Sequence, residues 1–165
     1  MRRLLAFIAT TLLLAACAAT SFGGAGLPPG ATRQDALAQL GNPTRAVRLA
    51  DGGERLQYSQ QPFGHEVWMV DLDAAGKVTG VRQVMRDAEF NRIMPGQWTR
   101  EDVEREFGPP AQVDAVASWN GPIYTYRWRD LDRADMFYWV YFDRQNVVQR
   151  AHRGMEFFNA PDRGR

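Results

Sequence analysis

The stretches PGATRQDALAQLGNP (residues 29–43) and PGQWTREDVEREFGPP (residues 95–110) decide the fold, because the second repeats the first with one inserted residue. Each stretch carries the signals of a short helix. Thr32 and Thr99 can act as N-caps, and an aspartate three residues later in each favours a capping box. Glycine and then proline end each helix. The repetition predicts two tandem units that begin alike.

Strand signals follow each helix in the same order, and turn residues separate them. The short connections favour antiparallel pairing of neighbouring strands. A further short helix is expected over residues 86–93, before the second unit. The sequence therefore predicts an α+β fold of two tandem repeats, each with one or two short helices packed on an antiparallel sheet of three to four strands. The expected strands are Arg45 to Ala50, Glu54 to Gln60, Glu66 to Asp73, Lys77 to Met85, Ala111 to Ala117, Ile123 to Arg129, Met136 to Asp143 and Val147 to Arg153.

The beginning of the chain has the pattern of an export signal. Two arginines precede an apolar run that is too short to span a bilayer, and small residues lead to Cys17, the only cysteine of the chain. This segment resembles a bacterial lipoprotein signal, in which the cysteine becomes the acylated first residue. Ala18, rather than aspartate, follows the cysteine and favours the outer membrane over the inner one. We expect a signal peptide at 1–16, a flexible tether at 17–29, the first repeat with its linking helix at 30–93, the second repeat at 94–160 and a frayed tail at 161–165.

Composition excludes several classes of function. Without Arg2 and Arg3, the 20 basic residues become 18 against 19 acidic residues, a net charge near −1 that argues against nucleic-acid binding. After lipidation of Cys17, no thiol remains for a disulfide. The two histidines, His65 and His152, stand in no spacing typical of a catalytic triad or a metal site. No enzymatic activity, metal or cofactor is therefore expected.

Six arginines in the second unit could suggest an anion-binding face, but four aspartates lie among them, which favours a mixed, solvated surface. The arginines are Arg127, Arg129, Arg133, Arg144, Arg150 and Arg153, and the aspartates are Asp130, Asp132, Asp135 and Asp143.

The repeated elements carry a family resemblance. The stretch EFNRIMPGQWTREDV (89–103), closing on FGPP (107–110), is similar to the opening of small lipoproteins of the SmpA/OmlA/BamE type. Their later strand signatures resemble VDLDAAGKV (70–78) and YFDRQNVV (141–148), together with Tyr58 and Tyr126. The resemblance implies an outer-membrane lipoprotein facing the periplasm, which serves as an accessory factor in outer-membrane protein assembly or envelope integrity by binding other proteins. The β-barrel assembly machinery is the partner that this resemblance suggests.

The chain departs from that family because it holds two such units. Tandem units also resemble the β-lactamase inhibitor proteins, whose eight strands form one concave sheet that grips an enzyme. An inhibitor or chaperone-like binder of a periplasmic enzyme is therefore the alternative function.

The aromatic strand at 136–142 is the best candidate for a binding surface. Its alternation places Met136, Tyr138, Val140 and Phe142 on one face and Phe137, Trp139 and Tyr141 on the other. In the first unit, the matching strand places Trp68, Val70 and Leu72 on the core face and Val67, Met69 and Asp71 opposite. Tyr124, Tyr126 and Trp128 are assigned to the core or its edge. Aromatic side chains on an open sheet are typical anchors of a protein interface. Two interpretations stay open for Phe137, Trp139 and Tyr141: an exposed interface, or a core covered by the tether or by the other unit.

Overall fold

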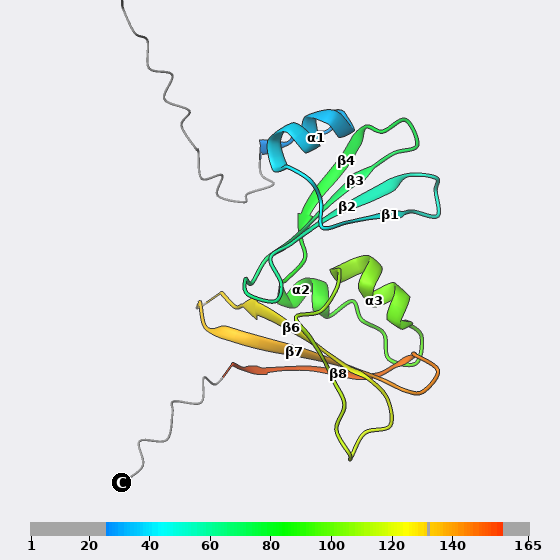
Figure 1. The fold of residues 1–165 in the computed structure, drawn as a ribbon, viewed down its shortest axis with the longest axis vertical. Helices are drawn as coiled ribbons and strands as arrows, with labels where there is room; N and C mark the ends of the chain where they lie inside the picture. Colours follow the sequence, from blue (N-terminus) through cyan, green and yellow to red (C-terminus); the bar gives the residue numbers. More distant parts are fainter. Residues whose placement is uncertain (1–25, 132, 157–165) are drawn as a thin grey trace, which may run out of the picture.

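The computed structural model describes residues 26–131 and 133–156 (Figure 1). They form two antiparallel sheets of four strands, in the orders β1-β2-β3-β4 and β5-β6-β7-β8. The predicted α+β fold with two repeated units is confirmed. The single concave eight-stranded sheet implied by the resemblance to inhibitor proteins is wrong, since the eight strands form two separate sheets. The elements are α1 (Arg33–Leu40), β1 (Arg45–Arg48), β2 (Glu54–Ser59), β3 (Val67–Leu72), β4 (Val78–Gln83), α2 (Asp87–Phe90), α3 (Arg100–Phe107), β5 (Gln112–Asp114), β6 (Ile123–Arg129), β7 (Asp135–Phe142) and β8 (Val148–Met155).

Both repeated helices begin and end as the sequence predicts. The hydroxyl oxygens of Thr32 and Thr99 accept the backbone N–H of Asp35 and Asp102, whose carboxylates accept the backbone N–H of the two threonines. Glycines with a φ of 77° end both helices, a conformation that costs other residues more. The local signals of the two repeats are therefore sufficient to set the helix bounds.

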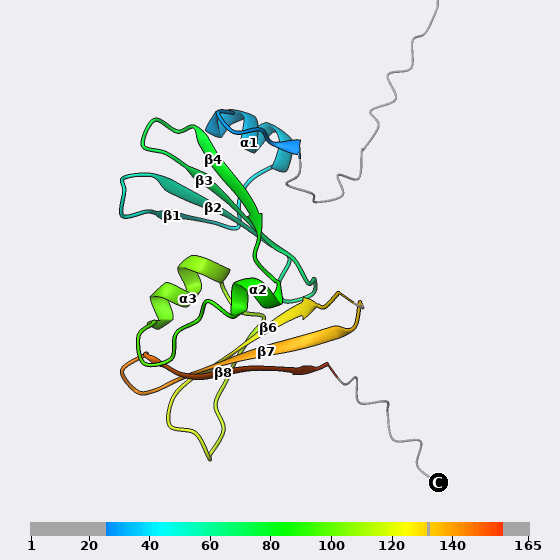
Figure 2. The same ribbon diagram turned by 180° about the vertical axis from the view of Figure 1, so that it is seen from behind.

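The elements stack in four layers, which Figure 1 shows from top to bottom and Figure 2 from behind. Helix α1 covers one face of the first sheet, and α2 with α3 lie between the first and the second sheet. The first core lies between α1 and the first sheet and contains Ala36, Leu56, Tyr58, Val70, Leu72 and Val78. The second core joins the first sheet, α2, α3 and the second sheet, and includes Val67, Met69, Phe90, Val103, Phe107, Tyr126, Trp128, Val140 and Phe142.

Two expectations about the first unit need correction. Val67 and Met69 are fully buried, because the helices of the second unit cover the face of the first sheet on which they lie. Leu27, within the expected tether, is also buried and belongs to the first core. The alternation of the strand determines only which residues share a face, and the neighbouring layer determines whether that face is exposed.

Several predictions fall on residues that the structure does not describe. The signal peptide, Cys17, most of the tether, residues 157–160 of the second repeat and the tail at 161–165 lie outside the described residues. Within the described part, no helix is long and apolar enough to cross a membrane.

Three features recur in both units and align the repeats residue by residue. The hydroxyl groups of Tyr58 and Tyr126 donate to the carbonyl oxygens of Gly41 and Gly108. The pairing register shifts after Asp71 in one sheet and after Tyr141 in the other. Isolated bridges join Thr32 to Lys77 and Thr99 to Val147. By this alignment, Val67, Met69 and Asp71 of β3 correspond to Phe137, Trp139 and Tyr141 of β7.

Candidate functional site

The three predicted binding residues lie on the outer face of the second sheet, which is the face directed away from α2 and α3. Phe137, Trp139 and Tyr141 are partly exposed, and the residues between them are buried. Among the described residues, no helix packs on this face (Figures 1 and 2). The described part of the first unit does not cover this face of β7, and residues 17–25 of the expected tether lie outside the described residues. The predicted core assignment is confirmed for Met136, Tyr138, Val140, Phe142, Tyr124, Tyr126 and Trp128.

The rings on this face form a continuous row, which we call the aromatic ladder. It runs from Trp119 through Tyr141, His152 and Trp139 to Phe137. Its successive ring centroids are 5.2, 5.4, 5.1 and 5.7 Å apart, within the range of favourable aromatic contacts. The imidazole Nε2 of His152 lies 3.2 Å from the hydroxyl oxygen of Tyr141. The ladder is a row of partly exposed rings with polar atoms at its edges.

Gly154 makes room for the Trp139 ring on β8. A Cβ atom at this position would lie 2.6 Å from Cζ3 of Trp139, a distance that the packed ring could not accommodate. Because glycine has no side chain, the indole can lie directly against the strand. The position of the Trp139 ring therefore depends on residues of two neighbouring strands, β7 and β8.

Sequence reasoning missed Trp119, which comes from the connection between β5 and β6. Its indole N–H donates to the carbonyl oxygen of Phe142 at 2.8 Å. Gly121, in the same connection, approaches the same carbonyl so closely that a Cβ would lie 2.1 Å from the oxygen. The tryptophan beside the turn residues Asn120-Gly121-Pro122 was the sequence signal that could have indicated this member of the site. Strand periodicity, however, does not predict where a loop packs on the sheet.

Arg150 lies on the same face, beside Tyr141 on β8. Its guanidinium carbon is 4.1 Å from the centroid of the Tyr141 ring and 5.6 Å from that of Trp119, which are cation–π distances. Within residues 26–131 and 133–156, no carboxylate pairs with Arg150. Of the aspartates expected to balance the arginines, Asp135 pairs with Arg129. Arg127 pairs instead with Glu156, and Arg153 pairs with Asp87 of α2.

The corresponding face of the first sheet carries charged side chains beside Val67 and Met69, although the second unit covers it. The buried guanidinium of Arg55 forms ion pairs with Asp71 and with Glu106 of α3, and it donates to the carbonyl oxygen of Arg105. Burial by itself lowers the pKa of Arg55, but the two carboxylates outweigh it and raise that pKa above its usual value. Gln57 donates to the carbonyl oxygens of Glu104 and Arg105. The helix therefore docks on this sheet through its last carbonyls and a carboxylate.

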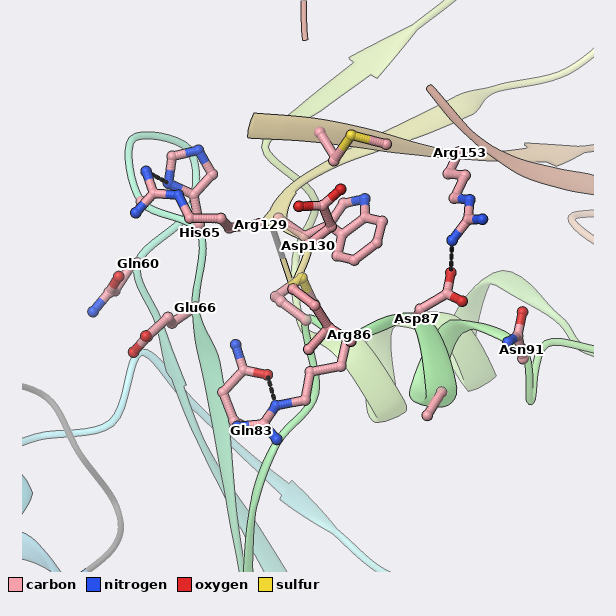
Figure 3. A pocket seen from close by; sticks show the side chains of 16 residues that line it. Gln60, His65, Glu66, Gln83, Arg86, Asp87, Asn91, Arg129, Asp130 and Arg153 are labelled. Atoms are coloured by element: carbon pink, nitrogen blue, oxygen red, sulfur yellow. Dashed lines mark hydrogen bonds and ion pairs between the residues drawn. The ribbon is translucent and has the colours of Figure 1, made fainter. Parts of the chain in front are cut away.

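A cleft of about 1290 Å³ opens where the two units meet (Figure 3). Two side-chain hydrogen bonds join residues that line it: Arg153 donates to Asp87 at 2.8 Å, and Arg86 donates to Gln83 at 3.2 Å. These pairs face the cleft from α2, β8 and the end of β4. The cleft is lined by Gln60, Gly64, His65, Glu66, Gln83, Met85, Arg86, Asp87, Ala88, Asn91, Trp128, Arg129, Asp130, Leu131, Met136 and Arg153.

The structure keeps the two histidines apart. His65 lines the cleft, with Nδ1 at 3.4 Å from a guanidinium nitrogen of Arg129 (Figure 3), whereas His152 belongs to the ladder. Burial lowers the pKa of His65 below its usual value, and Arg129 and Arg127 add to this effect against the opposing pull of Asp135 and Glu156. Among the described residues, no group of three or more His, Asp or Glu side chains is placed to hold a metal ion.

Comparisons with known proteins give only distant similarities. No protein-family model matches the chain, and no curated protein matches it. The DUF4309 family protein YjgB from Bacillus subtilis is similar at 16% identity and a TM-score of 0.32, over 76% of this chain and 79% of that one. An extracellular protein containing an SCP domain from Bacillus anthracis is similar at 16% identity and a TM-score of 0.30, over 78% of this chain and 44% of that one. At these TM-scores neither similarity carries an argument about function.

Proposed function

We propose that this protein binds another protein through the aromatic ladder on the outer face of its second sheet. In this proposal a lipid on Cys17 holds the chain at the periplasmic side of the outer membrane, where it serves as an accessory factor in outer-membrane protein assembly or envelope integrity. The role is binding rather than catalysis, and no cofactor takes part.

One observation carries the proposal: the uncovered face of the second sheet bears the aromatic ladder, whereas the covered face of the first sheet bears the ion pairs of Arg55 beside the buried Val67 and Met69. A face that stays in water usually gains charged residues, and the terminal units of stacked repeats are typically polar on their outer side. The second sheet departs from this pattern, because rings occupy the central strand of its uncovered face. Ile123 stands where the first sheet has Arg55, and Tyr141 stands where it has Asp71. Tyrosine, tryptophan and arginine are the residues most enriched in protein interfaces.

The binding role is tested by capture in the native envelope followed by affinity measurement. A photoreactive residue at position 137 should crosslink a partner, and the purified partner should bind the full chain. Trp139→Ala should weaken that binding about tenfold or more, since a central tryptophan is a typical hot spot. Leu131→Ala is the matched control, because Leu131 is fully exposed and belongs to the turn between β6 and β7 rather than to the ladder. Equal affinities of wild type and Trp139→Ala would contradict the proposal.

The identity of the captured protein separates the two roles that the sequence suggests. Components of the β-barrel assembly machinery would support the assembly role. A soluble periplasmic enzyme would instead favour the inhibitor role, and its activity should then fall when the full chain is added. Sensitivity of a deletion strain to large hydrophobic antibiotics tests the envelope role independently of the partner.

The lipid anchor is tested separately. Wild type should incorporate labelled palmitate and fractionate with the outer membrane, and Cys17→Ala should do neither. The motivation is the position of Cys17 behind the short apolar run. Incorporation of palmitate by Cys17→Ala, or a soluble wild type, would contradict the anchor without affecting the binding surface.

A further inference from the structure

The guanidinium of Arg150 lies over two rings, and no hydrogen bond or ion pair joins it to another described residue. Tyr141 lies 4.1 Å from the guanidinium carbon and Trp119 lies 5.6 Å from it. Stacking on rings fixes the plane of a guanidinium while it leaves the N–H groups at its edge available for hydrogen bonds. Such an edge fits a carboxylate with two parallel hydrogen bonds. The residue is therefore placed for recognition of an anion, and not only for packing.

The first sheet shows how this chain recognises a carboxylate on the corresponding face. Across that sheet, Arg55, Asp71 and Gly80 lie in one row. Arg55 is held by Asp71 and binds Glu106, which α3 presents. Arginine, the carboxylate that orients it and the carboxylate that it recognises thus all belong to one covered interface.

The same row of the second sheet contains Ile123, Tyr141 and Arg150. The arginine has moved from one side of the central strand to the other, and a ring has replaced the aspartate that would neutralise it. The row also contains Asp114 of β5, opposite Ile123, but its carboxylate accepts hydrogen bonds from Thr125 and Gln112. Among the described residues, no carboxylate forms an ion pair with Arg150, so a carboxylate for this guanidinium would come from whatever covers the face.

We infer that the partner presents an Asp or Glu side chain to the edge of Arg150, between apolar side chains that pack on Trp139 and Phe137. This inference rests on the proposed binding role of the ladder and specifies the chemistry of the partner protein. A second copy of the chain fits less well. Its uncovered helix, α1, has a single carboxylate, that of Asp35, which already accepts hydrogen bonds from Thr32.

The test uses two helical peptides of about 15 residues, a length at which isolated helices begin to be stable. Both have an apolar face of leucine and alanine, and they differ only by Glu or Gln at its centre. Binding to the ¹⁵N-labelled full chain is followed at the indole signals. The chain has five tryptophans, of which Trp119 and Trp139 report on the site and Trp68, Trp98 and Trp128 serve as internal controls.

The Glu peptide should shift the signals of Trp119 and Trp139 and bind about tenfold tighter than the Gln peptide at low salt, because a charge-assisted bidentate contact is strong and sensitive to screening. Arg150→Gln should remove the difference. Arg144 is an exposed arginine in the turn after β7, and it donates to Asn120. Arg144→Gln should preserve the difference between the two peptides. Equal binding of the two peptides, or binding of neither, would overturn the inference.

Two further results would replace the inferred partner with a different one. Vesicles containing phosphatidylglycerol that shift the same two indoles only when Arg150 is present would point to a lipid phosphate. Self-association that is lost in Trp139→Ala would point to a second copy. If neither peptide binds but a captured partner needs Trp139, the inferred carboxylate contact is wrong and the proposed binding role stands. A partner that binds Trp139→Ala normally overturns the proposed function itself.

Discussion

The corresponding faces of the two sheets share strand order, register and bulge, yet they differ in what they contact and in what they contain. The first sheet places Val67 and Met69 in the second core and surrounds them with ion pairs to α3. The second sheet places Phe137 and Trp139 on a surface that no described helix covers. The comparison teaches that a repeat can keep its backbone while the chemistry of one face follows its neighbour. The substitutions below test whether the two faces have diverged in this sense.

The largest difference is expected when the same charge is placed at corresponding positions. Met69→Asp should cost about 4 kcal/mol or more and prevent stable folding, because this fully buried site would remove a carboxylate from water and leave a cavity in the second core. Trp139→Asp should cost about 1 kcal/mol, since its carboxylate would reach water. Urea unfolding of the two variants measures the difference. Similar losses would mean that the ladder belongs to a core and is not a surface.

The buried ion pairs of the first sheet should be the next most sensitive feature. Arg55→Ala removes the buried guanidinium that Asp71 and Glu106 share and leaves these carboxylates only their longer contacts to other arginines. The expected cost is about 2–3 kcal/mol. Arg45→Ala is the control, because Arg45 binds Glu104 in the same interface but is about half exposed. Its expected cost is below about 1 kcal/mol. A loss for Arg55→Ala no greater than that of the control would show that the charges do not hold the units together.

Local signals were enough to predict the helices, the strands and the side-chain alternation, since each depends on neighbours in the chain. Thr32 and Thr99 set helix starts through contacts three residues away. The stacking of the units was not predictable in this way. Whether Met69 or Trp139 becomes buried depends on where α3 lies, and both have the same place in the alternation.

The missed members of the site, Trp119, Arg150 and His152, have the same explanation. Trp119 comes from a loop whose return over the sheet depends on the carbonyl oxygen of Phe142. Arg150 and His152 face Tyr141 and Trp139 through the pairing of β7 with β8. Such cross-strand neighbours follow from the register, and the register follows from a bulge that the sequence pattern did not reveal.

A smaller effect is expected from the two capping boxes, which are the most similar parts of the repeats. Thr32→Ala and Thr99→Ala should each cost about 1 kcal/mol, because each removes the hydroxyl acceptor for a helix N-terminal N–H. Serine at either position should restore most of the loss. Thermal unfolding of the four variants measures this. For Thr99→Ala the loss should appear in the free energy of global unfolding, because α3 lies between the sheets.

Amide hydrogen exchange provides the second readout for Thr32, whose helix covers only the first sheet. If α1 opens separately, exchange in residues 33–40 should accelerate in Thr32→Ala while global stability changes little. No change in either quantity would mean that the hydroxyl of Thr32 contributes nothing to the first unit.

The smallest effect concerns His65, which joins the first unit to the end of the second sheet at the cleft. Its pKa in the folded protein is lowered, chiefly by burial, so near pH 6.5 the unfolded chain binds a proton more readily than the folded one. The free energy of unfolding should therefore fall as the pH drops through about 6.5 and level off below the folded pKa. His65→Gln should lose this decline. Urea unfolding of both proteins at about pH 8 and about pH 5.5 measures this decline. The carboxylates are the same in both proteins, so their contribution to the pH dependence cancels in the comparison. Parallel changes in the two proteins would show that His65 is not held in its neutral form by the packing of the first unit against the second.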